Sequence, residues 1–495
     1  MLSRVVRCGA MKYEAVENYA GGQFQTRTTE RRNVISPLDG TVISQVPMSD
    51  TSDVEEAVRH AQEAFPAWAS LTSKQRAEVF YRYRALLKTD QDTLAQLIHD
   101  ENGKTVDEGR AEVVRAIEVT EFACALPQMV AGEVLEVSRG VECRVDRLPL
   151  GVVASIVPFN FPVMVPHWTI PIALGLGNTM VFKPSEQVPL SARRTAELLQ
   201  EAGLPPGVFN VIHGDQRASQ AIVDHPDVEA VTFVGSTPVA RQVYQRATNQ
   251  YKRALCLGGA KNHLLVLPDA DIEQTAANVV ASMAGCAGQR CMAAASMVAV
   301  GDIDPIIERV CQVAQELVPG AALGPVISAA AKSRIEDYIS EAEAAGATVL
   351  VDGRDAQVAG CEDGFYMGAT VLDQVQPEMR IAREEVFGPV LSILRATDID
   401  HAVQLENGSE YGNAAAVYTR SGGLARHIVQ RVSAGMIGVN IGVPVPLEPF
   451  GFGGWNESKF GVGDITGKSS IEFWTQSRKT TTRWTGEIKQ GWMGD

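Results

Sequence analysis

The sequence has few cysteines, and they do not form a metal-binding or disulfide framework. Eight cysteines are spread over 495 residues, and none belongs to a CxxC motif or to a Cys/His cluster with zinc spacing. Sparse, unpatterned thiols are typical of a protein in a reducing compartment. We therefore expect a reducing environment and no structural metal.

The chain also lacks an excess of positive charge and an uninterrupted apolar span. Its formal net charge of −15 gives no general attraction to nucleic acid or to anionic membranes, although a local basic pocket could still bind a phosphate. Residues 148–182 contain no Asp, Glu, Lys or Arg, but five prolines among them would break a spanning helix. We expect buried strand, loop and helix there, and neither nucleic acid nor a membrane as a partner.

A clear targeting segment is missing as well. The first seven residues, MLSRVVR, are basic, but they are short and weakly patterned for a signal or transit peptide. We expect a cytoplasmic protein, and a location in the mitochondrial matrix stays open if the source is eukaryotic.

What the sequence does contain is the pattern of an α/β protein with two or three domains. With 45% hydrophobic and 21% charged residues it has an ordinary globular composition. Residues 53–130 have helical periodicity, with one helix opening at Asp53 after an N-cap residue. Strands are predicted at 152–157, 179–182, 208–212 and 231–234, with a helix at 191–202. This alternation favours a parallel sheet with crossover helices.

A second alternating block follows Cys291. It has a predicted helix at 335–345 and predicted strands at 348–351 and 390–394. The two blocks join near residues 257–267, so we expect two domains with a cleft between them.

The segment VGSTPVA (234–240) follows a predicted strand and opens a helix. Ser236 or Thr237 could cap that helix, Pro238 suits its first turn, and Gly235 would let the backbone approach a phosphate. The segment is not GxGxxG, however, so on this motif alone a well-capped turn is the better explanation.

Two other loops carry polar side chains suited to ligand binding. In FKPSE (182–186), Lys183 and Glu186 could reach a ribose diol, where the carboxylate would repel a 2′-phosphate. A solvated charged turn explains that segment equally well. In PFNFP (158–162), the Asn160 amide is a suitable oxyanion donor, or else a turn residue that bonds to the backbone.

Cys291 lies in AGQRCMA (287–293), where Arg290 is the one charged side chain between residues 281 and 300. From this segment alone, Cys291 is either an inert core thiol or a nucleophile.

Taken together and in order, the motifs resemble the aldehyde dehydrogenase superfamily over nearly the whole chain. They are PFNFP, GNTMVFKPSE (177–186), VGSTPVA, LGG (257–259), GQRCM (288–292) and EEVFGP (384–389). The resemblance implies an α/β fold with a Rossmann-type NAD-binding domain (1–132 and 148–256), an α/β catalytic domain (257–450) and a small β oligomerisation extension (133–147 and 465–495). An extension of this kind would pair an edge strand with another subunit, as a homodimer or homotetramer.

The resemblance also implies a role for each motif residue. Cys291 is then the nucleophile, and Asn160 and the Cys291 backbone N–H form the oxyanion hole. The NAD-binding set is Pro158, Phe159, Lys183, Glu186, Gly235, Ser236, Glu385 and Phe387. Within it, Lys183 and Glu186 hold the adenosine ribose, Gly235 and Ser236 approach the pyrophosphate, and Glu385 and Phe387 position the nicotinamide ribose and ring.

One departure from the superfamily pattern bears on the reaction. Hydrolytic members place a glutamate, the base for the deacylating water, directly before LGG, and here that position is Cys256 in a stretch one residue longer than usual. Water, with a pKa near ~15.7, needs a base to attack a thioester, whereas a thiol with a pKa near ~8.5 is already partly ionised. The missing carboxylate therefore favours a thiol acceptor.

The chain is similar to one branch that uses such an acceptor, the CoA-acylating methylmalonate-semialdehyde dehydrogenases. The similarity lies at GAKNH (259–263), GQRCMA (288–293), LGPVIS (323–328), VPVPL (443–447) and the tail from FWTQ (473–476) to TTTRW (480–484), whereas GFGGWNES (451–458) follows the general superfamily. The branch implies that Arg115 and Arg290 support CoA binding, with Arg110 as a competitor for the first. Ion pairing, of Arg115 with Glu112 or Glu118, is the simpler explanation of these charges.

The expected activity is NAD-dependent oxidation of malonate or methylmalonate semialdehyde through a Cys291 thioester, with loss of CO2 and transfer to CoA. Two alternatives stay open: a hydrolytic aldehyde dehydrogenase with a different base, and a binding protein on this fold without activity. The sequence does not identify a side chain for the substrate carboxylate.

Overall fold

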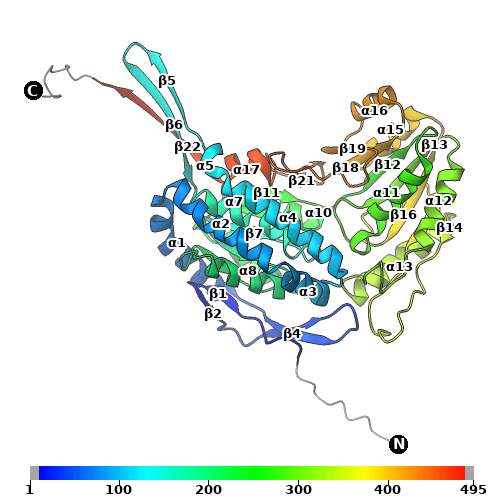
Figure 1. Ribbon diagram of the computed structural model, residues 1–495, viewed down its shortest axis with the longest axis horizontal. Helices are drawn as coiled ribbons and strands as arrows, with labels where there is room; N and C mark the ends of the chain where they lie inside the picture. Colours follow the sequence, from blue (N-terminus) through cyan, green and yellow to red (C-terminus); the bar gives the residue numbers. More distant parts are fainter. Residues whose placement is uncertain (1–10, 485–495) are drawn as a thin grey trace, which may run out of the picture.

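Two large sheets, each covered by helices, lie side by side and carry most of the chain (Figure 1). The computed structural model describes residues 11–484. The basic start MLSRVVR and the last part of the predicted extension, residues 485–495, lie outside the described residues.

The first sheet has eight strands in the order β2-β1-β9-β8-β7-β10-β11-β21. Their bounds are β1 (Asn18–Ala20), β2 (Gln23–Gln25), β7 (Val152–Ile156), β8 (Thr179–Lys183), β9 (Phe209–Val211), β10 (Val228–Val234), β11 (Arg253–Leu257) and β21 (Lys459–Phe460). The five from β9 to β11 run parallel, and β1 and β21 join antiparallel at the two sides. The strands predicted at 152–157, 179–182, 208–212 and 231–234 are therefore confirmed.

Helices from the first half of the chain and the crossover helices pack on this sheet. They are α1 (Thr51–Ser70), α2 (Ser73–Thr89), α3 (Gln91–Asn102), α4 (Val106–Cys124), α5 (Leu126–Met129), α6 (Met164–His167), α7 (Ile170–Gly175), α8 (Leu190–Glu201), α9 (Gln216–Asp224) and α10 (Thr237–Thr248). The predicted opening at Asp53 was two residues late. Helix α1 begins at Thr51 with Asp50 as its N-cap, and Asp53, the third residue of the helix, completes the capping box.

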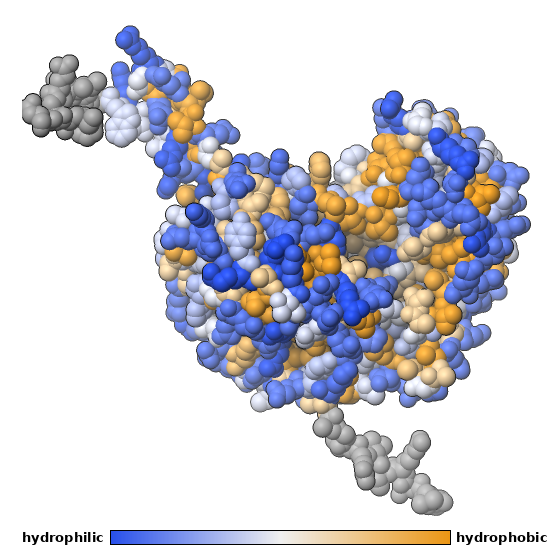
Figure 2. Space-filling model, viewed as in Figure 1, coloured by the Kyte–Doolittle hydropathy of each residue, from blue (hydrophilic) through white to orange (hydrophobic). Residues whose placement is uncertain are grey.

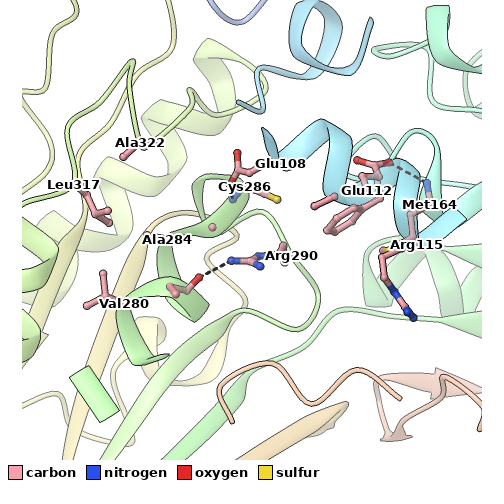
Figure 3. A pocket seen from close by; sticks show the side chains of 14 residues that line it. Glu108, Glu112, Arg115, Met164, Val280, Ala284, Cys286, Arg290, Leu317 and Ala322 are labelled. Atoms are coloured by element: carbon pink, nitrogen blue, oxygen red, sulfur yellow. Dashed lines mark hydrogen bonds between the residues drawn. The ribbon is translucent and has the colours of Figure 1, made fainter. Parts of the chain in front are cut away.

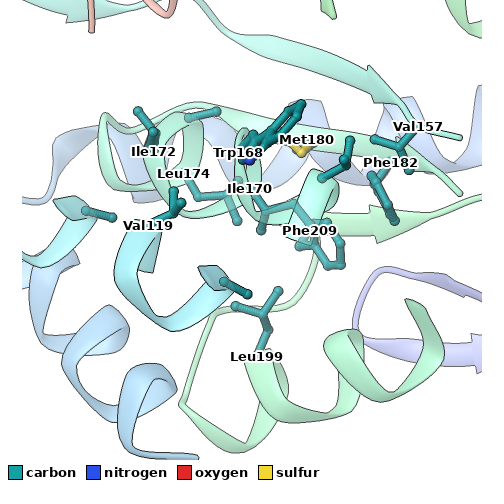
Figure 4. Close-up of a cluster of buried hydrophobic side chains, with 14 of the residues drawn as sticks. Val119, Val157, Trp168, Ile170, Ile172, Leu174, Met180, Phe182, Leu199 and Phe209 are labelled. Atoms are coloured by element: carbon teal, nitrogen blue, oxygen red, sulfur yellow. The ribbon is translucent and has the colours of Figure 1, made fainter. Parts of the chain in front are cut away.

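The first core contains buried side chains of α1 to α8 and of the sheet (Figure 4), whereas those of α9 and α10 belong to a separate core that shares the sheet and α1. Trp168, Phe182 and Phe209 are among its large side chains, and Phe182 stacks on Phe209 with ring centroids 5.8 Å apart. Burial of each such side chain contributes about 1.5–3 kcal/mol. This core explains why residues 148–182 are so apolar: they supply β7, α6, α7 and β8. Among the described residues, no helix is both long and apolar enough to span a bilayer.

The second sheet has seven strands in the order β14-β15-β16-β13-β12-β18-β19. They are β12 (Asn262–Val266), β13 (Ala294–Val300), β14 (Thr348–Val351), β15 (Thr370–Asp373), β16 (Val390–Ala396), β18 (Ala414–Tyr418) and β19 (Met436–Val439), with helices α11 (Ile272–Ala284), α12 (Asp304–Gln315), α13 (Ala329–Ala344), α14 (Arg380–Arg383), α15 (Ile399–Asn407) and α16 (Gly422–Val429). The 3₁₀ turn η1 (Gly285–Gly288) joins α11 to the loop that carries Cys291. The predicted crossing between blocks near 257–267 falls between β11 of the first sheet and β12 of the second.

Three smaller sheets complete the described part. A hairpin of β3 (Arg31–Ile35) and β4 (Val42–Pro47) and a pair of β17 (Tyr411–Gly412) and β20 (Trp455–Asn456) flank the large sheets. The third has the order β22-β6-β5, with β5 (Glu133–Ser138), β6 (Val141–Pro149) and β22 (Thr475–Arg483), and it projects from the body (Figures 1 and 2).

The projecting sheet contains the predicted extension segment 133–147 and, from the predicted segment 465–495, the strand β22. Its β5 is exposed along its length, with Leu135 67% exposed. Helix α17 (Gly467–Phe473), which falls within the predicted extension, packs instead in the first core through Ile471 and Phe473. The exact domain boundaries stay predictions.

Candidate active site

Two continuous cavities open at the carboxyl ends of β7, β8 and β10. The outer cavity has a volume of about 660 Å³ and the inner cavity about 250 Å³. They share Pro158, Phe159, Val234 and Gly235. In open parallel sheets this edge is where ligands bind, because the loops that follow the strands converge there.

All twelve residues predicted from the sequence line these two cavities or a third one, the arginine cavity. The outer cavity has Pro158, Phe159, Lys183, Glu186 and Gly235; the inner cavity adds Asn160, Ser236, Cys291, Glu385 and Phe387; the arginine cavity has Arg115 and Arg290. Their chemical roles remain predictions.

Lys183 and Glu186 face the outer cavity as an opposite-charge pair. Lys183 Nζ lies 3.8 Å from a Glu186 carboxylate oxygen and donates to the Pro184 carbonyl at 3.0 Å. Burial lowers the pKa of Lys183. Glu186 also accepts from Arg32 at 3.2 Å, so part of its charge is already paired.

The helix start at Ser236 differs from the sequence prediction. Ser236 is the N-cap residue of α10, but its side chain makes no capping hydrogen bond. Thr237 does not cap either: its hydroxyl accepts from the Gly259 N–H at 2.9 Å and donates to the Glu457 carbonyl. The prediction of a side-chain cap was therefore wrong, because tertiary contacts with the LGG loop use the threonine.

Gly235 is packed by its own strand and by the neighbouring one. Its N–H donates to the Leu257 carbonyl at 3.1 Å, and an added Cβ would lie 2.6 Å from the Phe233 ring. A larger residue would therefore have to displace the Phe233 ring.

Cys291 is held in the inner cavity by its backbone. Asn262 and Asn413 each donate to the Cys291 carbonyl at 2.8 Å. Two amide donors on one carbonyl fix the loop, so the thiol has a defined position.

The electrostatic surroundings keep this thiol protonated in the absence of a cofactor. Burial first, and then the Glu385 carboxylate, raise the pKa of Cys291 to about 12, while backbone N–H groups and Arg290 act in the opposite direction. A positive charge brought into the cavity would favour the thiolate.

Asn160 comes from the loop after β7 and is buried beside the nucleophile loop. Its Nδ2 donates to the Gln289 carbonyl at 3.0 Å. An amide nitrogen has two hydrogens, so one donor is left for a ligand oxygen.

Glu385 and Phe387 enter the inner cavity from the segment after α14. A Glu385 carboxyl oxygen accepts from the Ala260 N–H at 3.0 Å, and an added Cβ at Gly259 would lie 2.4 Å from the other oxygen. Burial raises the pKa of Glu385 to about 7. Phe387 has a φ of 56° and its ring meets Phe159 edge to face, with centroids 5.9 Å apart.

Cys256 does not face this cavity. It is fully buried in the core between the first sheet and helices α1, α9 and α10. Burial raises the pKa of its thiol. The position that bears the base in hydrolytic aldehyde dehydrogenases therefore supplies neither a carboxylate nor a thiolate to the inner cavity.

The arginine cavity has a volume of about 400 Å³ (Figure 3). Arg290 and Phe161, which line it, directly adjoin Cys291 and Asn160 in the chain. An Arg290 Nη donates to the Ala281 carbonyl at 2.6 Å. This hydrogen bond to the backbone can hold the nucleophile loop without an ion pair of Arg290. Arg115 pairs with Glu118, as the simpler explanation proposed, and lies 4.0 Å from Glu448.

Sequence reasoning missed the buried polar side chains that bind the loop of Phe159 and Asn160. Lys104 and Glu112 form a buried ion pair at 2.5 Å beside Asn160, and Asn102 Nδ2 donates to the Phe159 carbonyl at 2.8 Å. The signal was the polar run ENGK (101–104) at the end of a helix, which resembles an ordinary exposed helix end.

Comparisons with known proteins match nearly the whole chain. The model of the aldehyde dehydrogenase family matches residues 24–480. A malonate-semialdehyde dehydrogenase from Halalkalibacterium halodurans is 42% identical over 480 residues, 95% of this chain and 99% of the relative. One from Pseudomonas aeruginosa is 42% identical, over 94% of this chain and 95% of the relative.

Solved structures give the same picture. The crystal structure of methylmalonate-semialdehyde dehydrogenase from Oceanimonas doudoroffii has a TM-score of 0.94 and 40% identity, covering 96% of this chain and 99% of that one. A structure from Sinorhizobium meliloti 1021, determined in complex with NAD, has a TM-score of 0.95 and 40% identity, covering 97% and 100%.

Proposed function

Because the chain belongs to the aldehyde dehydrogenase family, we propose that it oxidises malonate or methylmalonate semialdehyde with NAD⁺ and transfers the acyl group to CoA. The products are acetyl-CoA or propionyl-CoA and CO2. The observation that carries the proposal is an inner cavity that joins Cys291 and Asn160 while Cys256, at the usual position of the hydrolytic base, is buried elsewhere.

The outer cavity has the size and lining of a dinucleotide site. Ligand cavities of ~300–1,000 Å³ are usual for cofactors, and this one has a volume of about 660 Å³ at the ends of parallel strands. Lys183 and Glu186 would bind the adenosine ribose, and Glu385 and Phe387 would orient the nicotinamide half near Cys291. NAD⁺ supplies a positive ring and a hydride acceptor when bound.

In the first half-reaction the Cys291 thiolate attacks the aldehyde carbon and forms a thiohemiacetal. The free hydrogen of Asn160 Nδ2 and the Cys291 backbone N–H donate to the new oxyanion. One such donor typically contributes about 10²–10³-fold to the rate. Loss of hydride from the same carbon leaves an acyl thioester on Cys291.

The thioester carbonyl then activates the substrate carboxylate, which lies β to it. Breaking the bond to that carboxylate releases CO2 and leaves a thioester enolate, which takes up one proton to become an acetyl or propionyl group. The oxyanion donors that served the first step are placed to stabilise the enolate oxygen too.

Transfer to CoA follows from what the cavity lacks. Water needs a base to attack a thioester, whereas a thiol is a stronger nucleophile at neutral pH. Arg115 and Arg290 line the arginine cavity next to Cys291 and offer cationic groups for the phosphates of CoA. Attack of the CoA sulfur on the thioester carbonyl releases the Cys291 thiolate.

A second function, hydrolysis to the free acid, is favoured by one specific observation. The Glu385 carboxyl group lies in the inner cavity with a pKa raised by burial to about 7, which suits a general base for water. A hydrolytic enzyme could recruit this group in place of the missing glutamate.

We also propose that the chain works as a homodimer or homotetramer in the cytoplasm. Within residues 11–484, the outer edges of β5 and β22 pair with no further strand, and bare edges are usually covered. A strand edge of another subunit fits this surface.

The test is product identification by mass spectrometry after incubation with each semialdehyde, NAD⁺ and CoA. Acetyl-CoA from malonate semialdehyde, and propionyl-CoA from the methyl homologue, are the expected products. Free malonate or methylmalonate as the main product would refute the acylating function.

A further inference from the structure

One end of α4 touches both loops that carry the proposed reacting groups. Glu108, Glu112 and Arg115 lie on one face of the helix, at positions i, i+4 and i+7, and all three line the arginine cavity (Figure 3). The carboxylate of each glutamate accepts a hydrogen bond from the backbone of a different loop.

Glu112 and Lys104 hold the loop of Asn160. Their ion pair measures 2.5 Å, and both side chains are almost fully buried. Lys104 Nζ also donates to the Asn160 carbonyl at 2.6 Å. The second Glu112 oxygen accepts from the backbone N–H groups of Val163 at 2.7 Å and Met164 at 3.0 Å. Together they bind the loop at the proposed oxyanion donor itself and three to four residues after it.

Glu108 holds the turn that leads to Cys291. One of its oxygens accepts from the Cys286 N–H at 2.6 Å, and the other completes the capping box of α4 with Thr105. Cys286 and Ala287 have φ values of 54° and 52°, a left-handed conformation that non-glycine residues rarely adopt. A strained turn of this kind persists only when surrounding contacts stabilise it, and the hydrogen bond from the Cys286 N–H to Glu108 is one such contact.

We infer that Lys104, Glu108 and Glu112 are positioning residues that fix the oxyanion donor Asn160 and the nucleophile Cys291 relative to each other. The two reacting groups come from different sheets, and this end of α4 bonds to the loop of each. The inference rests on the proposed function. Misplacement by about 1 Å costs roughly 10²-fold in rate, so loss of these contacts slows chemistry more than cofactor binding.

The first arm of the test replaces the ion pair as a unit. In Lys104→Met/Glu112→Gln no buried charge is left unpaired, and the glutamine can still accept from the Val163 and Met164 N–H groups. We expect the rate constant of the first NADH burst to fall about 10–100-fold, with the NAD⁺ dissociation constant changed less than about 3-fold. Glu112→Asp, which keeps both charges of the buried pair but shortens the reach to the Val163 and Met164 N–H groups, is the milder variant should the double variant not fold, with a loss of at least about 3-fold.

The matched control is Arg84→Met/Glu121→Gln, which removes an exposed pair that joins α2 to the same helix α4. Exposed pairs contribute little, so its burst rate should stay within about 2-fold. A loss equal to that of the buried pair would show a general effect of disturbing α4 and overturn the inference.

Coupling to Asn160 separates positioning from a merely structural role. If Lys104 and Glu112 act through this amide, their replacement in an Asn160→Ala background should cause little further loss of burst rate. A full additional 10–100-fold loss would overturn their assignment.

The second arm measures Glu108 by alkylation of Cys291 with iodoacetamide in the presence of NAD⁺. Glu108→Ala should slow alkylation and the burst about 10-fold, and Glu108→Gln, which retains an acceptor for the Cys286 N–H, should restore both to within about 3-fold. Unchanged rates in Glu108→Ala would refute this part. If Cys291→Ala or Asn160→Ala leaves aldehyde oxidation intact, the proposed function fails. If both substitutions abolish or strongly reduce oxidation while the variants of Lys104, Glu108 and Glu112 keep wild-type rates, only the inference fails.

Discussion

The ionisation of Cys291 gives a prediction that the structure makes quantitative. In the protein without cofactor, burial and the Glu385 carboxylate raise the pKa of this thiol to about 12. Because the raised pKa keeps the thiol protonated, the reactive thiolate is scarce at neutral pH and becomes more abundant as pH rises.

The magnitude follows from the fraction ionised. At pH 8 a thiol with a pKa of about 12 is ionised in roughly one molecule in 10⁴, against about one in four for an ordinary thiol with a pKa near 8.5. Below the pKa the thiolate fraction rises about tenfold for each pH unit. NAD⁺ in the inner cavity should reverse much of this deficit, since its positive ring favours the thiolate.

The assay is alkylation by iodoacetamide between pH 7 and 9.5, followed by mass spectrometry of the peptide that contains Cys291. Without NAD⁺ the rate constant should rise about tenfold per pH unit with no plateau. Glu385→Gln should accelerate the reaction at each pH, because it removes the second cause of the raised pKa. A plateau at or below pH 8.5 in the cofactor-free wild-type protein would refute the reasoning.

Three further predictions concern the proposed roles. Cys291→Ala should abolish aldehyde oxidation, measured as NADH formation, while calorimetric NAD⁺ binding stays within about 3-fold; an appreciable residual rate would contradict the nucleophile assignment. The kcat/KM with NAD⁺ should greatly exceed that with NADP⁺, and Glu186→Gln should reduce the ratio of the two values. Equal kcat/KM values in the wild type would count against a place for Glu186 at the adenosine ribose. Replacing Arg115 and Arg290 by methionine should raise the KM for CoA about tenfold or more, because charge-assisted contacts with its phosphates are lost. An unchanged KM would show that the two arginines do not bind CoA. The single variants show whether Arg290 also shapes the nucleophile loop.

The sequence predicted the architecture well where local pattern and motif order carry the information. The strands that end at Ile156, Lys183 and Val234 are short apolar runs followed by turn residues, so their position and the convergence of their loops could be foreseen. The motifs around Asn160, Cys291 and Glu385 lie far apart in the chain; their resemblance to the aldehyde dehydrogenase superfamily implied one site, and the three residues line one cavity.

What the sequence could not predict depends on tertiary contacts. Thr237 has the right chemistry and position for a helix cap, but the folded chain uses its hydroxyl for Gly259. Glu112 resembles an exposed helix charge, since nothing in its neighbourhood reveals that Lys104 folds over it in the interior. Buried ion pairs are decided by packing, and local patterns do not encode them.

The same holds for the charge state of Glu385. Burial raises its pKa to about 7, against the opposing effect of the Ala260 N–H, which donates to it from a segment more than 120 residues away. The family resemblance assigned Glu385 to the nicotinamide ribose, and no sequence pattern indicated that it could act as a competing base.

The central claim, that deacylation needs CoA, is tested most directly by the stoichiometry of NADH formation without CoA. Rapid mixing of the enzyme with NAD⁺ and malonate semialdehyde should give a burst of about one NADH per Cys291 and then a slow steady state, because the inner cavity holds no base at the Cys256 position. Addition of CoA should restore rapid turnover and yield acetyl-CoA. Full steady-state turnover without CoA, with a free acid as product, would contradict the account and favour hydrolysis through a base such as Glu385.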